Sequence, residues 1–371
     1  MFHLIFALPW LYVVTRFVWP LPWALPIKLT LSGVLLFASQ YHFWSKLSSG
    51  SVFTPQFPRH VVIAFNWAFG AISLLAAFQI ALDLLLLVAT VFGRGGDGDH
   101  HAARYAIGVA AVVLAGIGVR QASRIPPLRD ITVPIADLPA QFDGYTLVQL
   151  TDLHISRLFP ARWAQAVVAA TNALAPDLIV VTGDVIDGSV AMRERDVAPL
   201  AGLRAADGVY LIAGNHEYLC GYDSWMAHLS SLGMIELANS HAVFARGDDR
   251  LVLAGVTDPS ARGANRPLPD LDLALTGRPQ GAPVILLDHV PGKARAAAER
   301  GVALQLSGHT HGGMIVGLDR VVARANGGFV SGLYAVGGMA LYVNNGTGIW
   351  PGFALRLGKP SELTRITLRC A

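Results

Sequence analysis

Apolar residues are distributed unevenly along the chain. Four long apolar runs occupy roughly residues 2–18, 29–44, 61–92 and 105–119. A helix that spans a bilayer needs about 20 mostly apolar residues. The third run exceeds this length, the second and fourth are slightly short, and Pro9 and Arg16 interrupt the first. The pattern predicts an α-helical transmembrane region with four spans, or with three as the alternative.

The composition also indicates two different environments. Of the 371 residues, 53% are hydrophobic and only 14% are charged, whereas soluble globular proteins carry about 25% charged residues. The apolar excess lies before residue 125, and Pro126 and Pro127 then stiffen a short linker. We therefore predict two domains: a transmembrane anchor at residues 1–124, and a second domain with its linker at residues 125–371.

Basic residues near the ends of the runs bear on the orientation in the membrane. With four spans, five of them lie on the side of the second domain and four on the opposite side: Lys46, Arg59, Arg120, Arg124 and Arg129 against Arg16, Lys28, Arg94 and Arg104. Because Lys and Arg are enriched in cytoplasmic loops, this small excess favours a multi-pass protein with a cytoplasmic second domain. The first run lacks the basic start of a signal peptide, so we expect it to be retained.

Beyond the linker, β-branched runs alternate with helical patterns. Strands are predicted at residues 145–150, 178–181, 209–212, 251–256, 284–287, 303–306, 341–343 and 363–368, and helices at 161–174 and 292–300. Strands that alternate with helices are typical of sheets covered by helices. The predicted fold class is therefore α/β, a sandwich flanked by helices with a meander-like C-terminal part.

Polar side chains follow five of these strands directly. They are Asp152 and His154, Asp184, Asn215 and His216, His289, and finally His309 and His311. In open α/β sheets, ligands bind beyond the carboxyl ends of the strands, so we expect these side chains to meet. Asp, His and Asn without Cys form an oxygen and nitrogen site, which suits Mn, Fe or Zn.

The same motifs resemble those of the calcineurin-like metallophosphoesterase family. They are Asp-x-His at 152–154, Gly-Asp at 183–184, Gly-Asn-His-Glu at 214–217, the lone His289, and Gly-His-x-His at 308–311. The resemblance covers about residues 131–368 and is strongest to bacterial membrane-linked members, because of the lead-in at 137–145 and the Gly-His-Thr-His-Gly-Gly run at 308–313. It implies a metallophosphoesterase-type β-sandwich flanked by helices, which follows the transmembrane region of a bacterial inner-membrane protein. Met314 departs from the family, which usually has Gln there.

The resemblance also implies a role for each residue. Two divalent ions would be held, one by Asp152, His154, Asp184 and His311, and the other by Asp184, Asn215, His289 and His309. Asp184 would bridge the ions, and a hydroxide between them would attack the phosphorus. His216 would lie beside the ions and either protonate the leaving oxygen or stabilise charge on the phosphate.

Other polar residues permit two interpretations. In one interpretation, Asp187 and Asp288 hydrogen-bond to ligands, Glu217 orients the Gly-Asn-His loop and Asp258 lines the pocket. In the other, none of the four serves the site, and Asp187 and Asp288 are solvated loop acids. We expect Cys220 to be a packing residue, Asp83 to join helices by a polar contact, and His100 and His101 to lie in a solvated loop.

The substrate is less constrained than the chemistry. A domain tethered to a bilayer favours a phosphodiester or pyrophosphate with a lipid-like or envelope-derived part. Residues 314–338 are rich in glycine and apolar side chains, and would form a flap, an acyl-chain surface or a buried hairpin. The alternatives are a nonspecific phosphodiesterase or phosphomonoesterase for soluble compounds, and a non-catalytic membrane binding or sensory protein. With a net charge of +3 and no basic run beside the motifs, we expect no nucleic-acid partner.

Overall fold

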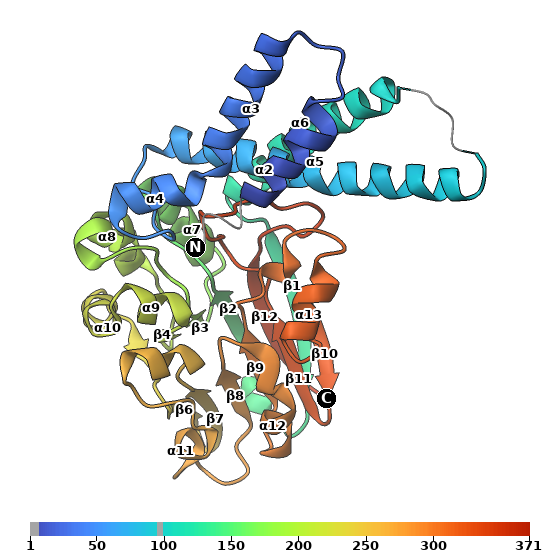
Figure 1. The fold of residues 1–371 in the computed structure, drawn as a ribbon. Helices are drawn as coiled ribbons and strands as arrows, with labels where there is room; N and C mark the ends of the chain where they lie inside the picture. Colours follow the sequence, from blue (N-terminus) through green and yellow to red (C-terminus); the bar gives the residue numbers. More distant parts are fainter. Residues whose placement is uncertain (1–6, 95–98) are drawn as a thin grey trace. The chain divides into compact units, whose positions relative to one another are not determined.

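The early apolar runs form helices in the computed structural model, which describes residues 7–94 and 99–371 (Figure 1). The helices are α2 (Ala7–Val13), the π-helical turn η1 (Val14–Val18), α3 (Leu25–Ser39), α4 (Tyr41–Ser49), α5 (Arg59–Val91) and α6 (His101–Ser123). Only α5, with mean hydropathy 2.3, and α6, with 1.9, are long and apolar enough among the described residues to cross a membrane. They match the third and fourth runs. The number of spans stays a prediction, and residues 2–6 of the first run lie outside the described residues.

The chain divides into two compact units. The helical unit comprises Met1–Ala122 and Pro351–Leu357, and the sandwich unit comprises Ser123–Trp350 and Gly358–Ala371. The division at residue 122 lies two residues from the boundary predicted at 124. In contrast, the sequence placed 351–357 with the second domain, whereas this segment belongs to the helical unit.

Two polar residues of α5 form hydrogen bonds inside the helical unit, one to the segment 351–357 and one to the N-terminal helices. Asn66 in α5 donates from its amide nitrogen to the carbonyl of Pro351 at 2.8 Å, and its amide oxygen accepts the N–H of Ala354 at 2.6 Å. These bonds satisfy backbone groups that would otherwise be buried without partners. Asp83 in α5 accepts hydrogen bonds from Tyr12 at 2.7 Å and Arg16 at 2.9 Å. The interpretation of Asp83 as a polar contact between helices is therefore confirmed.

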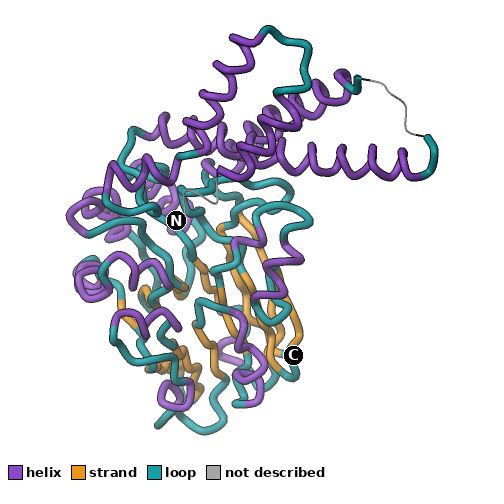
Figure 2. Tube along the Cα trace, in the orientation of Figure 1, coloured by secondary structure: helices purple, strands orange, loops and turns teal. Residues whose placement is uncertain are grey.

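Two six-stranded sheets form the sandwich unit. The strands are β1 (Leu128–Ile135), β2 (Thr146–Leu150), β3 (Leu178–Thr182), β4 (Val209–Ile212), β5 (Ile235–Glu236), β6 (Ser240–Arg246), β7 (Asp249–Gly255), β8 (Val284–Leu287), β9 (Leu304–Ser307), β10 (Gly332–Val336), β11 (Met339–Val343) and β12 (Leu363–Cys370). The sheet orders are β1-β12-β2-β3-β4-β5 and β10-β11-β9-β8-β7-β6. The predicted α/β fold class is confirmed. Figure 2 shows the strands in orange and the helices in purple.

The strand pairing departs from the predicted meander at the C-terminus. β10 and β11 do form an antiparallel hairpin, but β12 pairs with β1 and β2 in the other sheet. Ile366 and Leu368 of β12 are fully buried in the core between the sheets, which explains why this strand crosses over. Each predicted strand is present, and the sequence missed β1, β5, β6 and β10.

The helices of the sandwich unit lie along the connections between strands. They are α7 (Ala161–Asn172), α8 (Val190–Val197), α9 (Asn215–Cys220), α10 (Tyr222–Ser231), α11 (Leu271–Leu275), α12 (Ala294–Glu299) and α13 (Asp319–Ala325), with 3₁₀ turns η2 (Ala140–Phe142), η3 (Ala198–Gly202), η4 (Pro259–Ala264), η5 (Pro291–Lys293) and η6 (His311–Gly313). One apolar core fills the space between the sheets, and another packs α11 and α12 on the second sheet. Because β2, β3 and β4 run parallel, as do β8 and β9, their carboxyl ends lie at common edges.

Candidate metal centre

The five strand ends named from the sequence meet in one place. The two sheets join there through the imidazole of His289, whose Nδ1 lies 2.7 Å from the carbonyl of Thr182, and through the N–H of His309, which donates to Asp152 at 3.1 Å. Since a carbonyl can only accept, Nδ1 of His289 donates to Thr182, and Nε2 of the same ring faces the other polar residues. The fold thus brings together all eight predicted site residues.

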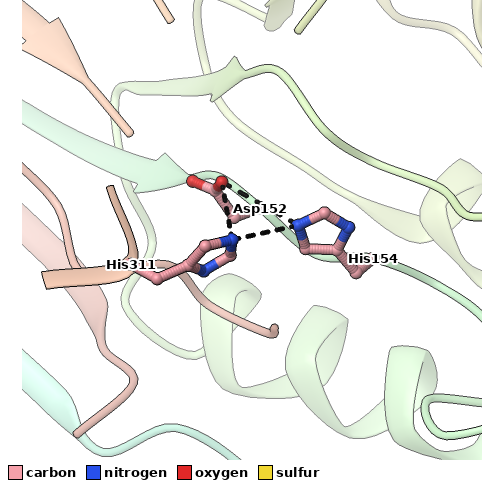
Figure 3. Close-up of side chains that lie close together, drawn as sticks. All are labelled: Asp152, His154 and His311. Carbon is pink, nitrogen blue, oxygen red and sulfur yellow. Dashed lines mark hydrogen bonds and ion pairs between the residues drawn. The ribbon is translucent and has the colours of Figure 1, made fainter. Parts of the chain in front are cut away.

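Asp152, His154 and His311 form the first group of converging ligand atoms (Figure 3). The Nε2 atoms of His154 and His311 lie 3.3 Å apart, and they are 3.9 and 3.5 Å from Oδ1 of Asp152. Ligand atoms placed tetrahedrally at ~2.1 Å from a metal ion are ~3.4 Å apart. The three atoms therefore have the spacing of ligands around a single cation.

Asp184 lies at the middle of the cluster and is 2% exposed. Its Oδ2 is 3.4 Å from Nε2 of His289 and 3.8 Å from Nε2 of His154, which belong to different groups of ligand atoms. Burial raises the pKa of Asp184, but the neighbouring imidazoles, His289 first, lower it well below its usual value. This carboxylate is therefore ionised and faces both halves of the cluster.

Asn215 belongs to the second group of ligand atoms, with His289 and His309. Its amide oxygen lies 3.3 Å from Nε2 of His289 and 3.0 Å from Nδ1 of His309. An amide oxygen, two imidazole nitrogens and the carboxylate of Asp184 again form an oxygen and nitrogen donor set. The chemistry of this set fits a borderline divalent cation.

Backbone conformation at these positions is unusual. Five of the eight residues adopt a left-handed conformation, namely Asp152, His154, Asp184, His309 and His311, with φ between 46° and 67°. Such a conformation costs a non-glycine residue about 1–3 kcal/mol and persists only where the surroundings impose it. Gly308 is also required, because a Cβ there would overlap Thr151 and Asp152. The backbone at these strand ends therefore adopts a less stable local conformation, which directs the side chains toward the cluster.

Asp187 orients two of the histidines at once. One of its oxygens lies 2.5 Å from Nδ1 of His216 and the other lies 3.1 Å from Nδ1 of His154. Burial raises the pKa of Asp187, but these two imidazoles lower it. Conversely, burial lowers the pKa of His216, but Asp184 and Asp187 raise it to about 10. The interpretation of Asp187 as a hydrogen-bond partner is confirmed, and it fixes the Nδ1 tautomer of both rings.

Glu217 braces the backbone of the site. Its carboxylate accepts the N–H groups of Asp184 at 2.9 Å, Val185 at 2.7 Å and Gly214 at 2.7 Å. It is fully buried, and burial together with Asp184 raises its pKa to about 7. The prediction that Glu217 orients the Gly-Asn-His loop is confirmed.

The other candidate residues do not join the cluster. Burial and then Asp258 raise the pKa of Asp288 to about 7, but within the described ranges neither carboxylate hydrogen-bonds to a predicted ligand. Burial raises the pKa of the Cys220 thiol to about 12, and its sulfur accepts the N–H of Gly188 at 3.3 Å. This environment confirms that Cys220 is a packing residue.

The sequence missed a sixth strand end that also shapes the site. After β11, the N–H groups of Thr347 and Gly348 donate to the carbonyls of Thr151 and Asp152 at 2.8 and 2.9 Å. A Cβ at Gly346 would lie 3.0 Å from Nδ1 of His311. The signal was present, because the run Asn-Asn-Gly-Thr-Gly directly follows the predicted strand at 341–343.

Comparisons with known proteins identify the family to which the chain is similar. A family model described as calcineurin-like phosphoesterase matches residues 145–313. A transmembrane protein with metallophosphoesterase domain from Danio rerio is 35% identical over 272 residues, which cover 71% of this chain and 62% of that protein. The uncharacterized metallophosphoesterase YkuE of Bacillus subtilis is 31% identical over 70% of this chain and 93% of its own length. Among solved structures, NAD nucleotidase of Haemophilus influenzae matches with 17% identity and a TM-score of 0.39, over 55% of this chain and 50% of that one.

Proposed function

This chain belongs to the calcineurin-like metallophosphoesterase family, and we propose that it is a metal-dependent phosphoester hydrolase that cleaves a phosphodiester or pyrophosphate bond in a lipid-linked or envelope-derived substrate. The observation that carries the proposal is the convergence of two ligand groups on Asp184. A single ion would need only one of these groups, whereas hydrolysis by a pair of ions needs both and a carboxylate between them.

The distances support a specific division of the ligands. One ion is assigned to Asp152, His154, Asp184 and His311, and the other to Asp184, Asn215, His289 and His309. Two divalent ions held there would supply Lewis acidity, lower the pKa of bound water and neutralise charge on the phosphate. The donor set suits Mn, Fe or Zn, and measurement of the bound metal decides among them.

His216 is assigned the transfer of a proton to the leaving oxygen. Its Nδ1–H donates to Asp187, so its Nε2 is directed toward Oδ2 of Asp184, 3.9 Å away. An imidazole in this place reaches a phosphate held at the cluster without occupying a ligand position of its own. Loss of its ring therefore affects turnover more than metal content.

The helical unit supports a substrate near a membrane. α5 and α6 have the length and hydropathy of membrane-spanning helices, and the Danio rerio relative is described as a transmembrane protein. A hydrolase tethered in this way meets lipid phosphoesters at a high local concentration. We place the sandwich unit in the cytoplasm and the helices across the membrane as multiple spans, following the charges beside the runs.

The experiment uses the full chain in detergent, because Pro351–Leu357 belongs to the helical unit. Methyl p-nitrophenyl phosphate is the soluble probe, tested with Mn, Zn or Mg and with a chelator. Bound metal is counted by mass spectrometry in the wild type, in Asp184→Asn and in His216→Ala. Asp207→Asn, which removes a carboxylate bonded to Tyr145 and Arg246, is the control.

We expect Asp184→Asn to lose both turnover and bound metal. His216→Ala should retain the metal and lose about 100-fold or more in kcat, which is the usual contribution of a positioned acid. Metal-independent turnover in the wild type, or full activity in either variant, would refute the proposed centre.

A further inference from the structure

A loop of the sandwich unit begins and ends at the metal centre. The N–H of Gly313 donates to the carbonyl of Thr310 at 2.8 Å, and the hydroxyl of Thr310 donates to the carbonyl of Val330 at 2.7 Å. Thr310 stands between His309 and His311. Residues 314–329 therefore leave and rejoin the fold beside two of the assigned metal ligands.

The loop has a fixed shape. Ile315 pairs with Gly358, and Asp319 forms an ion pair with Lys359 at 2.9 Å. At the other end, Arg295 donates to the carbonyl of Gly327 at 3.1 Å. Gly313 has no room for a side chain, because a Cβ would overlap the backbone of Asp319 at the start of α13. These contacts hold the start of α13 against Gly313, two positions after His311.

Apolar side chains on this loop face solvent. Val316 is 66% exposed, Val321 is 59% exposed and Leu318 is 39% exposed. No residue of α13 is buried. Single exposed apolar residues are ordinary, but three within six positions beside an active site indicate a binding surface.

Two cations accompany the apolar residues. Arg320 and Arg324 are exposed, and in the described part of the chain neither forms an ion pair. We call Val316–Arg324 the ledge. Apolar side chains combined with arginines complement a molecule that carries both hydrocarbon and negative charge, as anionic lipids do.

The geometry points to the ledge as the site that receives the acyl part of a lipid phosphoester, and we propose this as the substrate-binding surface. The inference rests on the proposed function, because it assumes that the phosphate lies at the metal centre. Val316 lies five positions after His311 in the chain, and five residues span at most ~17 Å. The hydrocarbon of one membrane leaflet is ~15 Å thick, so the length of an acyl chain is comparable with the largest possible separation of His311 from the start of the ledge.

The test compares two p-nitrophenyl phosphodiesters that share the scissile bond. In one, the second ester group is dioleoylglycerol, and in the other it is methyl. In both, water attacks phosphorus and p-nitrophenolate leaves, so the same absorbance reports both reactions. The full chain is assayed in mixed micelles with Mn. The ledge variant is Val316→Ser with Val321→Ser, and the control is Leu273→Ser with Val243→Ser, at apolar positions 55% and 41% exposed on other elements.

We expect the ledge variant to raise KM for the dioleoylglycerol ester about tenfold, from the loss of apolar contact by two side chains. Its kcat/KM for the methyl ester should equal that of the wild type, which shows that the variant is folded and the centre intact. The control should leave both substrates unchanged.

The outcomes separate this inference from the proposed function. Unchanged KM for the dioleoylglycerol ester in the ledge variant, or an equal effect on both esters, would overturn the ledge while hydrolysis by the metal centre stands. Wild-type hydrolysis of the methyl ester alone would also overturn it. Wild-type turnover of neither ester would refute the proposed function, and the ledge with it.

Discussion

Replacing Asp187 by Asn tests how the histidines of the centre are held. The wild-type carboxylate is fully buried and accepts the Nδ1–H groups of His216 and His154, one on each oxygen. Asparagine has almost the same shape but only one acceptor oxygen. Its NH₂ group would face the second imidazole N–H, and two donors cannot bond to each other.

The size of the effect follows from the bond that is lost. A hydrogen bond to a charged group contributes about 1.5–3 kcal/mol, which corresponds to about tenfold to a hundredfold. If the amide oxygen of the asparagine accepts the Nδ1–H of His154, the His216 ring changes tautomer and kcat falls by this factor. If the amide oxygen instead accepts the Nδ1–H of His216, the His154 ring carries its proton on Nε2 and metal affinity falls by about 10–100-fold. Either arrangement is measurable.

The assay titrates Mn into the metal-free full chain and follows hydrolysis of methyl p-nitrophenyl phosphate. It yields a metal affinity and a kcat at saturating metal for the variant, the wild type and the Asp207→Asn control. The expected result is a tenfold or larger loss in one of the two quantities in the variant only. If both quantities remain within about twofold of the wild type, Asp187 does not position the histidines and the reasoning is wrong.

Three further predictions concern the support of the site. Glu217→Gln leaves at least one of three buried backbone N–H groups without an acceptor, so we expect Tm in a thermal melt to fall by about 4–8 °C, for a cost of about 2 kcal/mol; an unchanged Tm would contradict the brace. Gly308→Ala should abolish activity because its Cβ overlaps two neighbouring side chains, whereas Gly263→Ala, which has open space, should retain it. With a pKa raised to about 12, Cys220 should hold roughly a thousandfold less thiolate at neutral pH than an ordinary thiol, so iodoacetamide should label the exposed Cys370 first in peptide mass spectra; faster labelling of Cys220 would contradict its burial.

Much of the site could be predicted because its signal is local. A strand ends where its apolar run ends, and the next one or two residues, such as Asp184 after β3, are necessarily at the sheet edge. Within each sheet, the alternation of strands and helices then places the ends of the parallel strands at one edge. Left-handed backbone at Asp184, His309 and His311 is not visible in the sequence, but adjacent glycines accompany it at 183, 308 and 312.

Other features depend on contacts between distant positions. Asp187 and Asp288 each lie beside a ligand in the sequence, yet only Asp187 bonds to the histidines. Nothing in the local sequence distinguishes them, because the distinction arises from the direction in which each loop leaves its strand. Similarly, the apolar residues of β12 fit either a meander or a crossing to the first sheet, and the packing of Ile366 decides for the crossing.

The sequence by itself determined the ligand types, their order along the chain and the division into apolar helices and an α/β unit. Each of these is set by residues within a few positions of one another, through periodicity and strand ends. The tertiary structure alone decided that Asp184 faces both ligand groups, that Pro351–Leu357 belongs with the helices, and that the chain returns at Val330 to Thr310 beside the metal centre. These relations join residues tens to hundreds of positions apart, and only the packing of the cores brings them together.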